Sequence, residues 1–271
     1  MSEHIHSTAI VDRTAEIGDG VQIGPYAVIG ARVRVGANTE VGARAQIEGP
    51  TVLGRDNRLY PNACVGFDPQ DLKYDGEDTT LTVGDGNIFR EFCTVHRGTT
   101  QGGGETTIGS GNLFMTYTHI AHDCHVGDKT VFANAGTLAG HVIVEDGATV
   151  GAFSAVQQFC RVGRHAYIGG FSVITLDALP FMKTVGAKPV CLGVNSIGMR
   201  RRGFSAETIK SVSGAMRILL RSGLNNTDAV EAMRSDFPGV AEVQQIIDFV
   251  SSSEKGLIKA LPGRRGGRGG R

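Results

Sequence analysis

An apolar residue recurs at every sixth position through most of this 271-residue chain. The first run comprises Val11, Ile17, Ile23, Ile29, Val35, Val41, Ile47, Leu53, Leu59 and Val65, and the second comprises Ile108, Phe114, Ile120, Val126, Phe132, Leu138, Val144, Val150, Val156, Val162, Ile168 and Ile174. A short run at Val83, Phe89 and Val95 lies between them. Helices and strands repeat at about 3.6 and 2 residues, so neither produces this period. A hexapeptide repeat is typical of a β-helix, and we predict this fold for residues 1–190.

The repeat also predicts which residues stack on one another. In a triangular coil, each side is a short strand whose apolar repeat residue points inward, so three hexads complete one coil. Residues i and i+18 then stack one strand spacing apart, about 4.8 Å. Glycine directly follows most repeat residues of the first run, and we expect it to relieve a bend that needs unusual backbone angles.

Two breaks in the repeat predict loops that leave the coil. Residues 67–82 include Gln70, Asp71 and Lys73, whereas residues 97–107 (RGTTQGGGETT) are rich in glycine and are expected to be mobile. Loops on a rigid scaffold often carry binding residues. The alternative is that both loops are solvated surface segments without a function.

The repeat ends near Phe181, and residues 191–259 show helical patterns. Ser205 is a candidate N-cap, Gly223 a candidate helix end and Thr227 a second helix start. A third helix is predicted by the apolar spacing of Val243, Ile246, Ile247 and Val250. Residues 260–271, which contain mainly arginine and glycine, are predicted to be disordered, and we favour no nucleic-acid partner for them.

Charge and cysteine content narrow the class of protein further. Residues 1–180 carry 12 Lys/Arg against 20 Asp/Glu, whereas residues 181–271 carry 15 against 7, which favours an acidic partner or phosphates at the basic end. The five cysteines lack a CxxC pair and are interpreted as reduced, mostly buried thiols. We find no membrane span or signal peptide and expect a cytoplasmic protein.

Reactive side chains concentrate in residues 116–127 (TYTHIAHDCHVG). Stacking by 18 places Gly140 over His122 with Gln158 above it, and His141 over Asp123 with Phe159 above it. Histidine, with an unperturbed pKa of about 6.5, suits a general base, and an adjacent carboxylate would orient its ring.

A zinc site built from His119, His122 and His125 is the alternative interpretation of this segment. We rank it lower because residues three apart on such a coil do not share a face. We expect neither a metal nor an organic cofactor.

The segments HIAHDCHVG, DLKYDGE, HRGTTQGGG, LAGHV, GVNSIGMRRRGFS and GLIK together closely resemble the UDP-N-acetylglucosamine O-acyltransferases of lipid A synthesis. The resemblance covers residues 1–259. It implies a left-handed parallel β-helix and a homotrimer with active sites between neighbouring subunits. It further implies transfer of a 3-hydroxyacyl chain from acyl carrier protein to the 3-hydroxyl of UDP-N-acetylglucosamine.

The resemblance also implies a role for particular residues. His122 matches the general base, Asp123 the residue that orients it, and Gly140 the backbone N–H at the oxyanion. The implied substrate contacts are Gln70, Asp71, Lys73, His119, His141, Gln158, Asn195, Arg201 and Arg202. The basic helical part would dock the acidic carrier protein.

Three positions bear on specificity within this resemblance. Gln157 stands where the family commonly has histidine, which could favour a 3-amino acceptor. Ile197 stands where an acidic residue is frequent near the uridine. Gly170 matches the closed end of the acyl pocket, and its small size leaves room for a longer chain.

Three other functions remain as alternatives. A related N-acyltransferase would attack with an amine. A γ-type carbonic anhydrase would hold zinc between subunits. A non-catalytic β-helical scaffold would need neither the His122–Asp123 pair nor the arginines.

Overall fold

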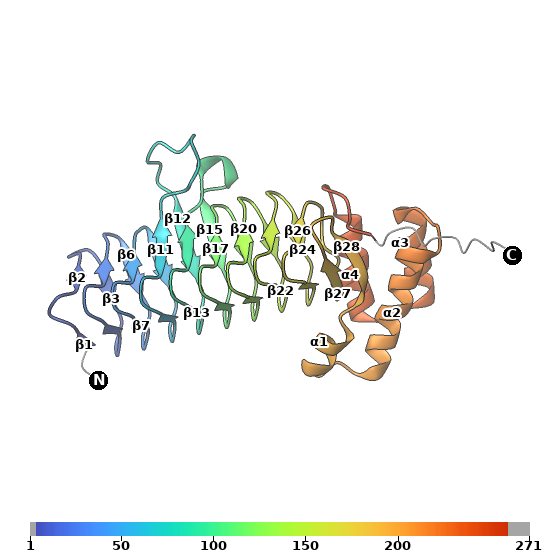
Figure 1. Cartoon of the computed structure of the whole chain (residues 1–271), viewed down its shortest axis with the longest axis horizontal. Coiled ribbons are helices and arrows are strands. Elements are labelled where there is room, and N and C mark those ends of the chain that lie inside the picture. Colours follow the sequence, from blue (N-terminus) through green and yellow to red (C-terminus); the bar gives the residue numbers. More distant parts are fainter. Residues whose placement is uncertain (1–3, 260–271) are drawn as a thin grey trace, which may run out of the picture.

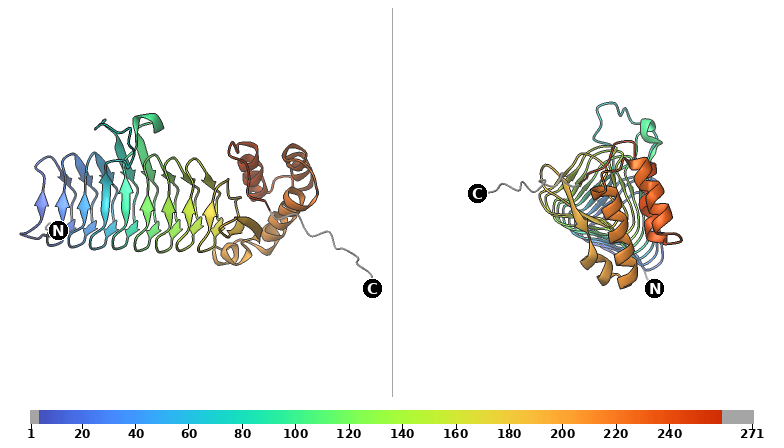
Figure 2. Two further views of the ribbon diagram at one scale, coloured as in Figure 1. Left: turned by 45° about the horizontal axis from the view of Figure 1, so that its top comes forward. Right: turned by 90° about the vertical axis from the view of Figure 1, so that its right-hand side faces the viewer.

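The computed structural model describes residues 4–259 and shows a parallel β-helix that ends in a helical part (Figure 1, Figure 2). Its strands form three sheets, which we call the first, second and third sheets in the order in which the chain visits them. We call the turns between them the first corner (first to second sheet), the second corner (second to third) and the third corner (third back to first). The predicted β-helix is confirmed.

The strands are short and recur in strict rotation. The first sheet contains β1 (His4–Ile5), β4 (Gln22–Ile23), β7 (Glu40–Val41), β10 (Arg58–Leu59), β13 (Ile88–Phe89), β16 (Leu113–Phe114), β19 (Val131–Phe132), β22 (Thr149–Val150), β25 (Tyr167–Ile168), β27 (Met182–Val185) and β28 (Val190–Val194). The second contains β2 (Ile10–Val11), β5 (Val28–Ile29), β8 (Gln46–Ile47), β11 (Cys64–Phe67), β14 (Thr94–His96), β17 (His119–Ile120), β20 (Thr137–Leu138), β23 (Ala155–Val156) and β26 (Val173–Ile174). The third contains β3 (Glu16–Ile17), β6 (Val33–Val35), β9 (Thr51–Leu53), β12 (Thr80–Val83), β15 (Glu105–Ile108), β18 (His125–Val126), β21 (Ile143–Val144) and β24 (Arg161–Val162).

The six-residue repeat supplies the core, as predicted. Repeat residues from Ile23 to Ile174 are at most 3% exposed, and they form one continuous apolar column inside the coil. Phe89, Phe114 and Phe132 stack within it, with ring centroids 5.0 and 5.2 Å apart. The repeat residues before Ile23 are less buried because the coil is open at that end.

The predicted stacking by 18 is also confirmed. His119 pairs with Thr137, and Thr137 pairs with Ala155, in parallel register. The two breaks lengthen this offset, since Leu59 pairs with Phe89 and Phe89 with Phe114. The inserted residues leave the coil at the second corner, and Figure 1 shows both loops projecting from the same side.

The expected role of the glycines that follow the repeat residues was wrong for all of them in the first run except Gly66, whose φ is 82°. Left-handed backbone angles fall mainly three positions after the repeat residue and are carried by other residue types, such as Tyr26, Arg44 and Asp56. The glycine directly after the repeat residue is needed for close approach instead. A Cβ on Gly36 would lie 2.4 Å from backbone atoms of Gly54 in the next coil. Stacking distance, rather than backbone angle, therefore selects glycine there.

Asparagine side chains form a buried ladder at the third corner. The Asn87 amide donates to Asn57 Oδ1 at 3.0 Å and to the carbonyl of Gly84 at 3.1 Å. Asn87 Oδ1 accepts from the backbone N–H of Asn112 at 2.9 Å. The ladder supplies hydrogen bonds to backbone groups of the corner turns, which lie outside the strands.

The described chain ends in a strand hairpin and four helices. β27 pairs in parallel with β25 and antiparallel with β28. The helices are α1 (Ser196–Arg201), α2 (Ala206–Arg221), α3 (Asn226–Asp236) and α4 (Ala241–Ser251). Ser205 caps α2 as predicted, because its hydroxyl accepts from Thr208 N at 3.0 Å. The second predicted helix is α3. It is capped by Asn225, which accepts from the N–H of Asp228, and it begins at Asn226 rather than at Thr227.

A second apolar core holds this C-terminal part together. It begins at Leu179 and includes Met182, Val212, Met233 and Val243.

The predicted boundary between residues 190 and 191 falls inside β28, and the division into domains stays a prediction. The predicted tail, residues 260–271, lies outside the described residues. No helix within residues 4–259 is long and apolar enough to cross a bilayer.

The cysteines agree with their interpretation as reduced thiols. All five are free, and all but the half-buried Cys64 are buried. Burial raises the pKa of the Cys124 thiol to about 12, and its Sγ lies 3.2 Å from the carbonyl oxygen of Ala139. This thiol is therefore a core group rather than a nucleophile.

Candidate active site

The histidine-rich segment passes from the second sheet, around the second corner, to the third sheet. His119 lies on β17, His125 lies on β18, and the His122–Asp123 pair occupies the turn between them. Asp123 has the left-handed φ of 59° that the coil imposes at this turn position. The side chains of His122 and Asp123 therefore project from the turn, whereas those of His119 and His125 project from the strands.

His122 and Asp123 form a hydrogen-bonded pair. His122 Nδ1 lies 2.7 Å from Asp123 Oδ2, and the Asp123 side chain is only 1% exposed. Because an ionised carboxylate only accepts hydrogen bonds, Nδ1–H is the donor in this pair, and in the neutral ring Nε2 then keeps its lone pair. The pair therefore has the arrangement of an oriented general base.

Two threonines fix Asp123 from the buried side. Thr99 donates to the carboxylate from its backbone N–H (to Oδ1) and from its hydroxyl (to Oδ2), both at 2.7 Å. The Asp123 backbone N–H donates to Thr106 Oγ1 at 2.8 Å. We expected residues 97–107 to be mobile, but Thr99 is 2% exposed and bonded to Asp123.

Gly140 lies directly beside the His122 ring, as the stacking by 18 predicted. A Cβ at this position would lie 2.6 Å from His122 Cε1 and 2.8 Å from Nε2. His141 N–H donates to the His122 carbonyl at 3.0 Å, which locks the two turns in register. Across residues 4–259, no hydrogen-bond acceptor takes the Gly140 N–H. A backbone donor is thus free beside the imidazole.

His141 completes the cluster. Its ring stands at 90° to that of His122, with centroids 5.2 Å apart, and stacks on Phe159 at 4.5 Å. Its Nε2 lies 3.6 Å from Asp123 Oδ2. Burial lowers the pKa of His141, an effect that the negative charges of Asp123 and Asp71 partly oppose. A neutral His141 can contact a substrate without adding charge beside His122.

The structure does not bring His119, His122 and His125 together. His119 Nδ1 lies 2.8 Å from Thr94 Oγ1, and His125 Nδ1 lies 2.8 Å from Thr107 Oγ1. Burial lowers the pKa of His119 to about 4, so this ring is neutral near pH 7. The potential metal ligands that do converge in the described chain are His122, Asp123 and His141, with ligand atoms within 4.8 Å of one another. The first two of these already bond to each other.

The first loop carries Gln70, Asp71 and Lys73. Asp71 Oδ1 accepts from Lys73 N–H at 3.0 Å, and the side chains of Gln70 and Lys73 are exposed. The buried Arg97 anchors the loop base by donating to the Gly66 carbonyl and the Asp68 carboxylate. The influence of Asp71 on the pKa of His141 indicates that this loop faces the cluster.

Asn195, Arg201 and Arg202 gather elsewhere, in a cavity of about 580 Å³ against the first sheet. Thr149, Tyr167 and Lys183 form the sheet side of this cavity, and Ile197 also lines it. Asn195 Nδ2 donates to the His165 carbonyl at 3.2 Å while its Oδ1 caps α1. The first sheet and the second corner are different sides of the coil, so one chain does not unite this cavity with His122.

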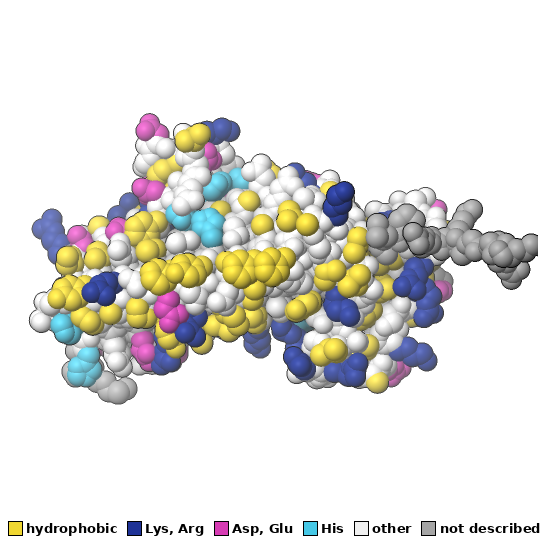
Figure 3. Space-filling view, viewed as in Figure 1, with side chains coloured by type: hydrophobic (Ala, Val, Ile, Leu, Met, Phe, Trp, Pro, Cys, Tyr) yellow, Lys and Arg dark blue, Asp and Glu magenta, His cyan; other side chains and the backbone are white. Residues whose placement is uncertain are grey.

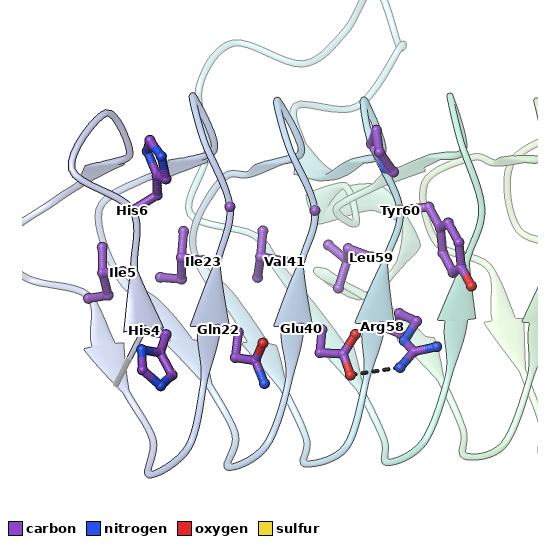
Figure 4. A pocket seen from close by; sticks show the side chains of 13 residues that line it. His4, Ile5, His6, Gln22, Ile23, Glu40, Val41, Arg58, Leu59 and Tyr60 are labelled. Carbon is purple, nitrogen blue, oxygen red and sulfur yellow. Dashed lines mark hydrogen bonds and ion pairs between the residues drawn. The ribbon is translucent and has the colours of Figure 1, made fainter. Parts of the chain in front are cut away.

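The remaining predicted positions are accessible. Gln157 and Gln158 are exposed beside Phe159, and Gly170 is exposed at the first corner. A Cβ on Gly170 would come near only the Ala152 backbone, at 3.2 Å. A separate groove of about 640 Å³ runs across the first sheet near its N-terminal end, where Glu40 pairs with Arg58 (Figure 4). None of the residues around His122 lines that groove.

Thr99, Gly102 and Thr106 also contact the His122–Asp123 pair or each other, although the sequence did not predict them as parts of the site. The HRGTTQGGG segment carried the signal, because its glycines allow a tight loop. Its insertion breaks the stacking by 18, so no register placed it against Asp123.

Comparisons with known proteins find similar sequences over nearly the whole chain. The family model "Udp N-acetylglucosamine O-acyltransferase; Domain 2" matches residues 177–258, and "Bacterial transferase hexapeptide (six repeats)" matches residues 14–49. An acyl-[acyl-carrier-protein]–UDP-N-acetylglucosamine O-acyltransferase from Halorhodospira halophila is 49% identical over 94% of this chain and 99% of its own length. The protein of the same name from Stenotrophomonas maltophilia is 46% identical over 94% of this chain and 97% of its own length.

Solved structures give the same answer. UDP-N-acetylglucosamine O-acyltransferase from Moraxella catarrhalis superimposes with a TM-score of 0.92 at 41% identity, covering 94% of this chain and 99% of that one. LpxA from Acinetobacter baumannii gives 0.92 at 43% identity with the same coverage.

The repeat, the coil and the matching relatives therefore define a hexapeptide-repeat transferase. More particularly, the chain belongs to the acyl-[acyl-carrier-protein]–UDP-N-acetylglucosamine O-acyltransferase family, as the resemblance predicted.

Proposed function

We propose that this protein transfers a 3-hydroxyacyl chain from acyl carrier protein to the 3-hydroxyl of UDP-N-acetylglucosamine, in lipid A synthesis. The observation that carries the proposal is the His122–Asp123–Gly140 arrangement in a chain 49% identical to a relative that bears the name of this activity. The His122 imidazole is hydrogen-bonded to a carboxylate through Nδ1 and has a backbone N–H beside it. This combination suits acyl transfer from a thioester, with Nε2 as the base.

In the proposed mechanism, His122 Nε2 takes the proton of the sugar hydroxyl as its oxygen attacks the thioester carbonyl carbon. The new C–O bond forms a tetrahedral intermediate, and the Gly140 N–H donates to its oxyanion. Collapse of the intermediate breaks the C–S bond, and the imidazolium returns the proton to the departing sulfur. Asp123, bonded to Nδ1, stabilises the imidazolium between the two steps.

Each element of this mechanism has a typical worth. A positioned general base contributes about 10²- to 10⁴-fold in rate. One oxyanion donor contributes roughly 2.7–4 kcal/mol in other acyl-transfer sites. Base and donor therefore matter comparably.

We further propose a homotrimer whose active sites lie between subunits, and a left-handed coil. Exposed aromatic residues along the first corner support the assembly, because a row of this kind favours burial against another chain. Phe92 stacks on Tyr117 and Phe153 on Phe171, with Phe171 72% exposed. Figure 3 shows the hydrophobic row running along the coil below the histidines. A second copy would also bring the arginine cavity to His122.

Substrate contacts are assigned within this assembly. Gln70, Asp71 and Lys73 would contact the sugar and phosphates, with His119, His141 and Gln158 around the sugar and acyl ends. Asn195, Arg201 and Arg202 would bind the nucleotide, where guanidinium forks suit phosphate oxygens. The basic C-terminal part would dock the acidic carrier protein. We place the protein in the cytoplasm in this proposal.

The test is mass spectrometry of products from UDP-N-acetylglucosamine, its 3-amino analogue and mixed 3-hydroxyacyl carrier proteins. Wild-type protein should acylate the 3-hydroxyl sugar, and His122→Ala should not. Acylation of the amino analogue alone would instead identify an N-acyltransferase, with Gln157 as the first position to examine. No product from folded protein would contradict the proposal.

A further inference from the structure

The loop between β14 and β15 lies against the buried side of the His122–Asp123 pair. The geometry points to Thr99 as a positioning residue that fixes the Asp123 carboxylate and, through it, the His122 ring. This inference rests on the proposed role of His122 as the base. Thr99 itself lies behind the carboxylate and would not touch substrate.

Thr99 engages both oxygens of the carboxylate. Its N–H donates to Oδ1 and its hydroxyl to Oδ2, each at 2.7 Å, while His122 Nδ1 lies 2.7 Å from Oδ2. Two donors on one rigid residue leave the carboxylate plane little freedom to rotate. Since the third donor is the imidazole, the plane of Asp123 sets the direction of His122.

The backbone of the loop fixes the orientation of the Thr99 hydroxyl. Gly102 N–H donates to Thr99 Oγ1 at 3.2 Å, and Gly104 N–H donates to the Thr99 carbonyl at 2.8 Å. The hydroxyl therefore accepts from the loop and has one proton to give, which goes to Asp123. The loop thereby aligns its donor before any substrate binds.

Gly102 shows how closely the loop packs on the carboxylate. A Cβ there would lie 2.0 Å from Asp123 Cγ, so only glycine fits. The glycines of the segment are thus explained by contact with the catalytic pair rather than by mobility. Gly103, in contrast, has a left-handed φ of 99° and open space around it.

Thr106 has a different task. It accepts the Asp123 backbone N–H at 2.8 Å and so holds the main chain at the turn. This contact leaves the side-chain torsions of Asp123 free. Removing the Thr99 hydroxyl should therefore loosen the carboxylate while the corner stays folded.

The experiment compares Thr99→Val, which loses the hydroxyl, with Thr99→Ser, which keeps it. We expect Thr99→Val to lower kcat about 10- to 100-fold, the effect of one hydrogen bond to a charged group, with KM for UDP-N-acetylglucosamine changed less than about twofold. Thr99→Ser should retain at least about half of kcat, again because the charged hydrogen bond remains. The His122 Nδ1 proton resonance should shift in Thr99→Val and not in Thr99→Ser.

Thr107→Val is the matched control. Thr107 lies on the same strand-loop unit, and its hydroxyl bonds to the exposed His125, outside the catalytic cluster. Its kcat should match that of the wild type. Thermal unfolding of every variant separates loss of folding from loss of positioning.

The outcomes distinguish this inference from the proposed function. If His122→Ala is inactive but Thr99→Val has wild-type kcat, or changes only KM or the unfolding temperature, Thr99 does not position the pair. If His122→Ala is fully active, the proposed base is wrong. Low kcat in Thr99→Val with recovery in Thr99→Ser supports both.

Discussion

Replacement of Gly140 by alanine tests the position of the His122 ring directly. The added methyl carbon would lie 2.6 Å from His122 Cε1. Carbon atoms in ordinary contact are about 3.5 Å apart, so the ring must move by about 0.9 Å. The 2.7 Å bond between His122 Nδ1 and Asp123 Oδ2 opposes this movement.

The size of the effect follows from this displacement. A misplacement of about 1 Å can cost roughly 100-fold in rate, or about 2.7 kcal/mol. Gly140 does not have a left-handed φ, so alanine fits the backbone, and its N–H is kept. Loss of activity in Gly140→Ala would therefore report ring position rather than loss of the oxyanion donor.

The assay measures kcat with UDP-N-acetylglucosamine and acyl carrier protein, together with thermal unfolding. Gly136→Ala is the control on the same coil, because the nearest atoms to its Cβ would be Ala133 O at 3.1 Å and the Val150 side chain and carbonyl at 3.4 and 3.7 Å. We expect about 100-fold lower kcat for Gly140→Ala and little change for the control. A folded Gly140→Ala enzyme with more than about a third of wild-type kcat would refute a base held at this position.

Three further predictions follow from other sites. Gly170→Met should shift donor preference to shorter acyl chains because it fills the open space at the first corner, and an unchanged product distribution from mixed donors would contradict this. Burial lowers the pKa of both His119 and His165 to about 4, so between pH 6.5 and 4 the unfolded chain binds more protons than the folded chain. The free energy of unfolding should therefore fall as the pH drops through this window. The expected loss is about 1–2 kcal/mol per histidine, after allowance for partial exposure. Urea unfolding midpoints across that range would check it, and a flat profile would count against it. Asn87→Ala should cost about 2–4 kcal/mol in chemical unfolding because it leaves several buried groups unpaired, whereas Asn226→Ala, at an exposed helix position without a left-handed φ, should cost less than about 0.5 kcal/mol.

Much of the coil could be predicted because one physical rule governs it. The inward repeat residue must be apolar, so the period alone identified core positions such as Ile120 and Leu138. The same period predicted the contact between Gly140 and His122. Periodicity thus carried both the fold and the centre of the candidate site.

Features outside the period could not be predicted in the same way. Thr99 reaches Asp123 across 24 positions of sequence, an offset that the inserted loop sets and no repeat encodes. The hairpin of β27 and β28 follows the last repeat residue, where the pattern no longer applies. Sequence alone does not separate a glycine needed for close approach from one needed for an unusual φ, so the cause of the glycine content could not be predicted.

The two inserted loops change the offset between stacked positions to 30 and then to 25, yet the asparagine ladder continues across both. Each coil contacts only its neighbours, so extra residues at one corner need not disturb the strands on the other sides. Chemistry and architecture are thereby separable in this molecule. A lineage of such proteins could lengthen, shorten or exchange the substrate loops while inheriting the same stack unchanged.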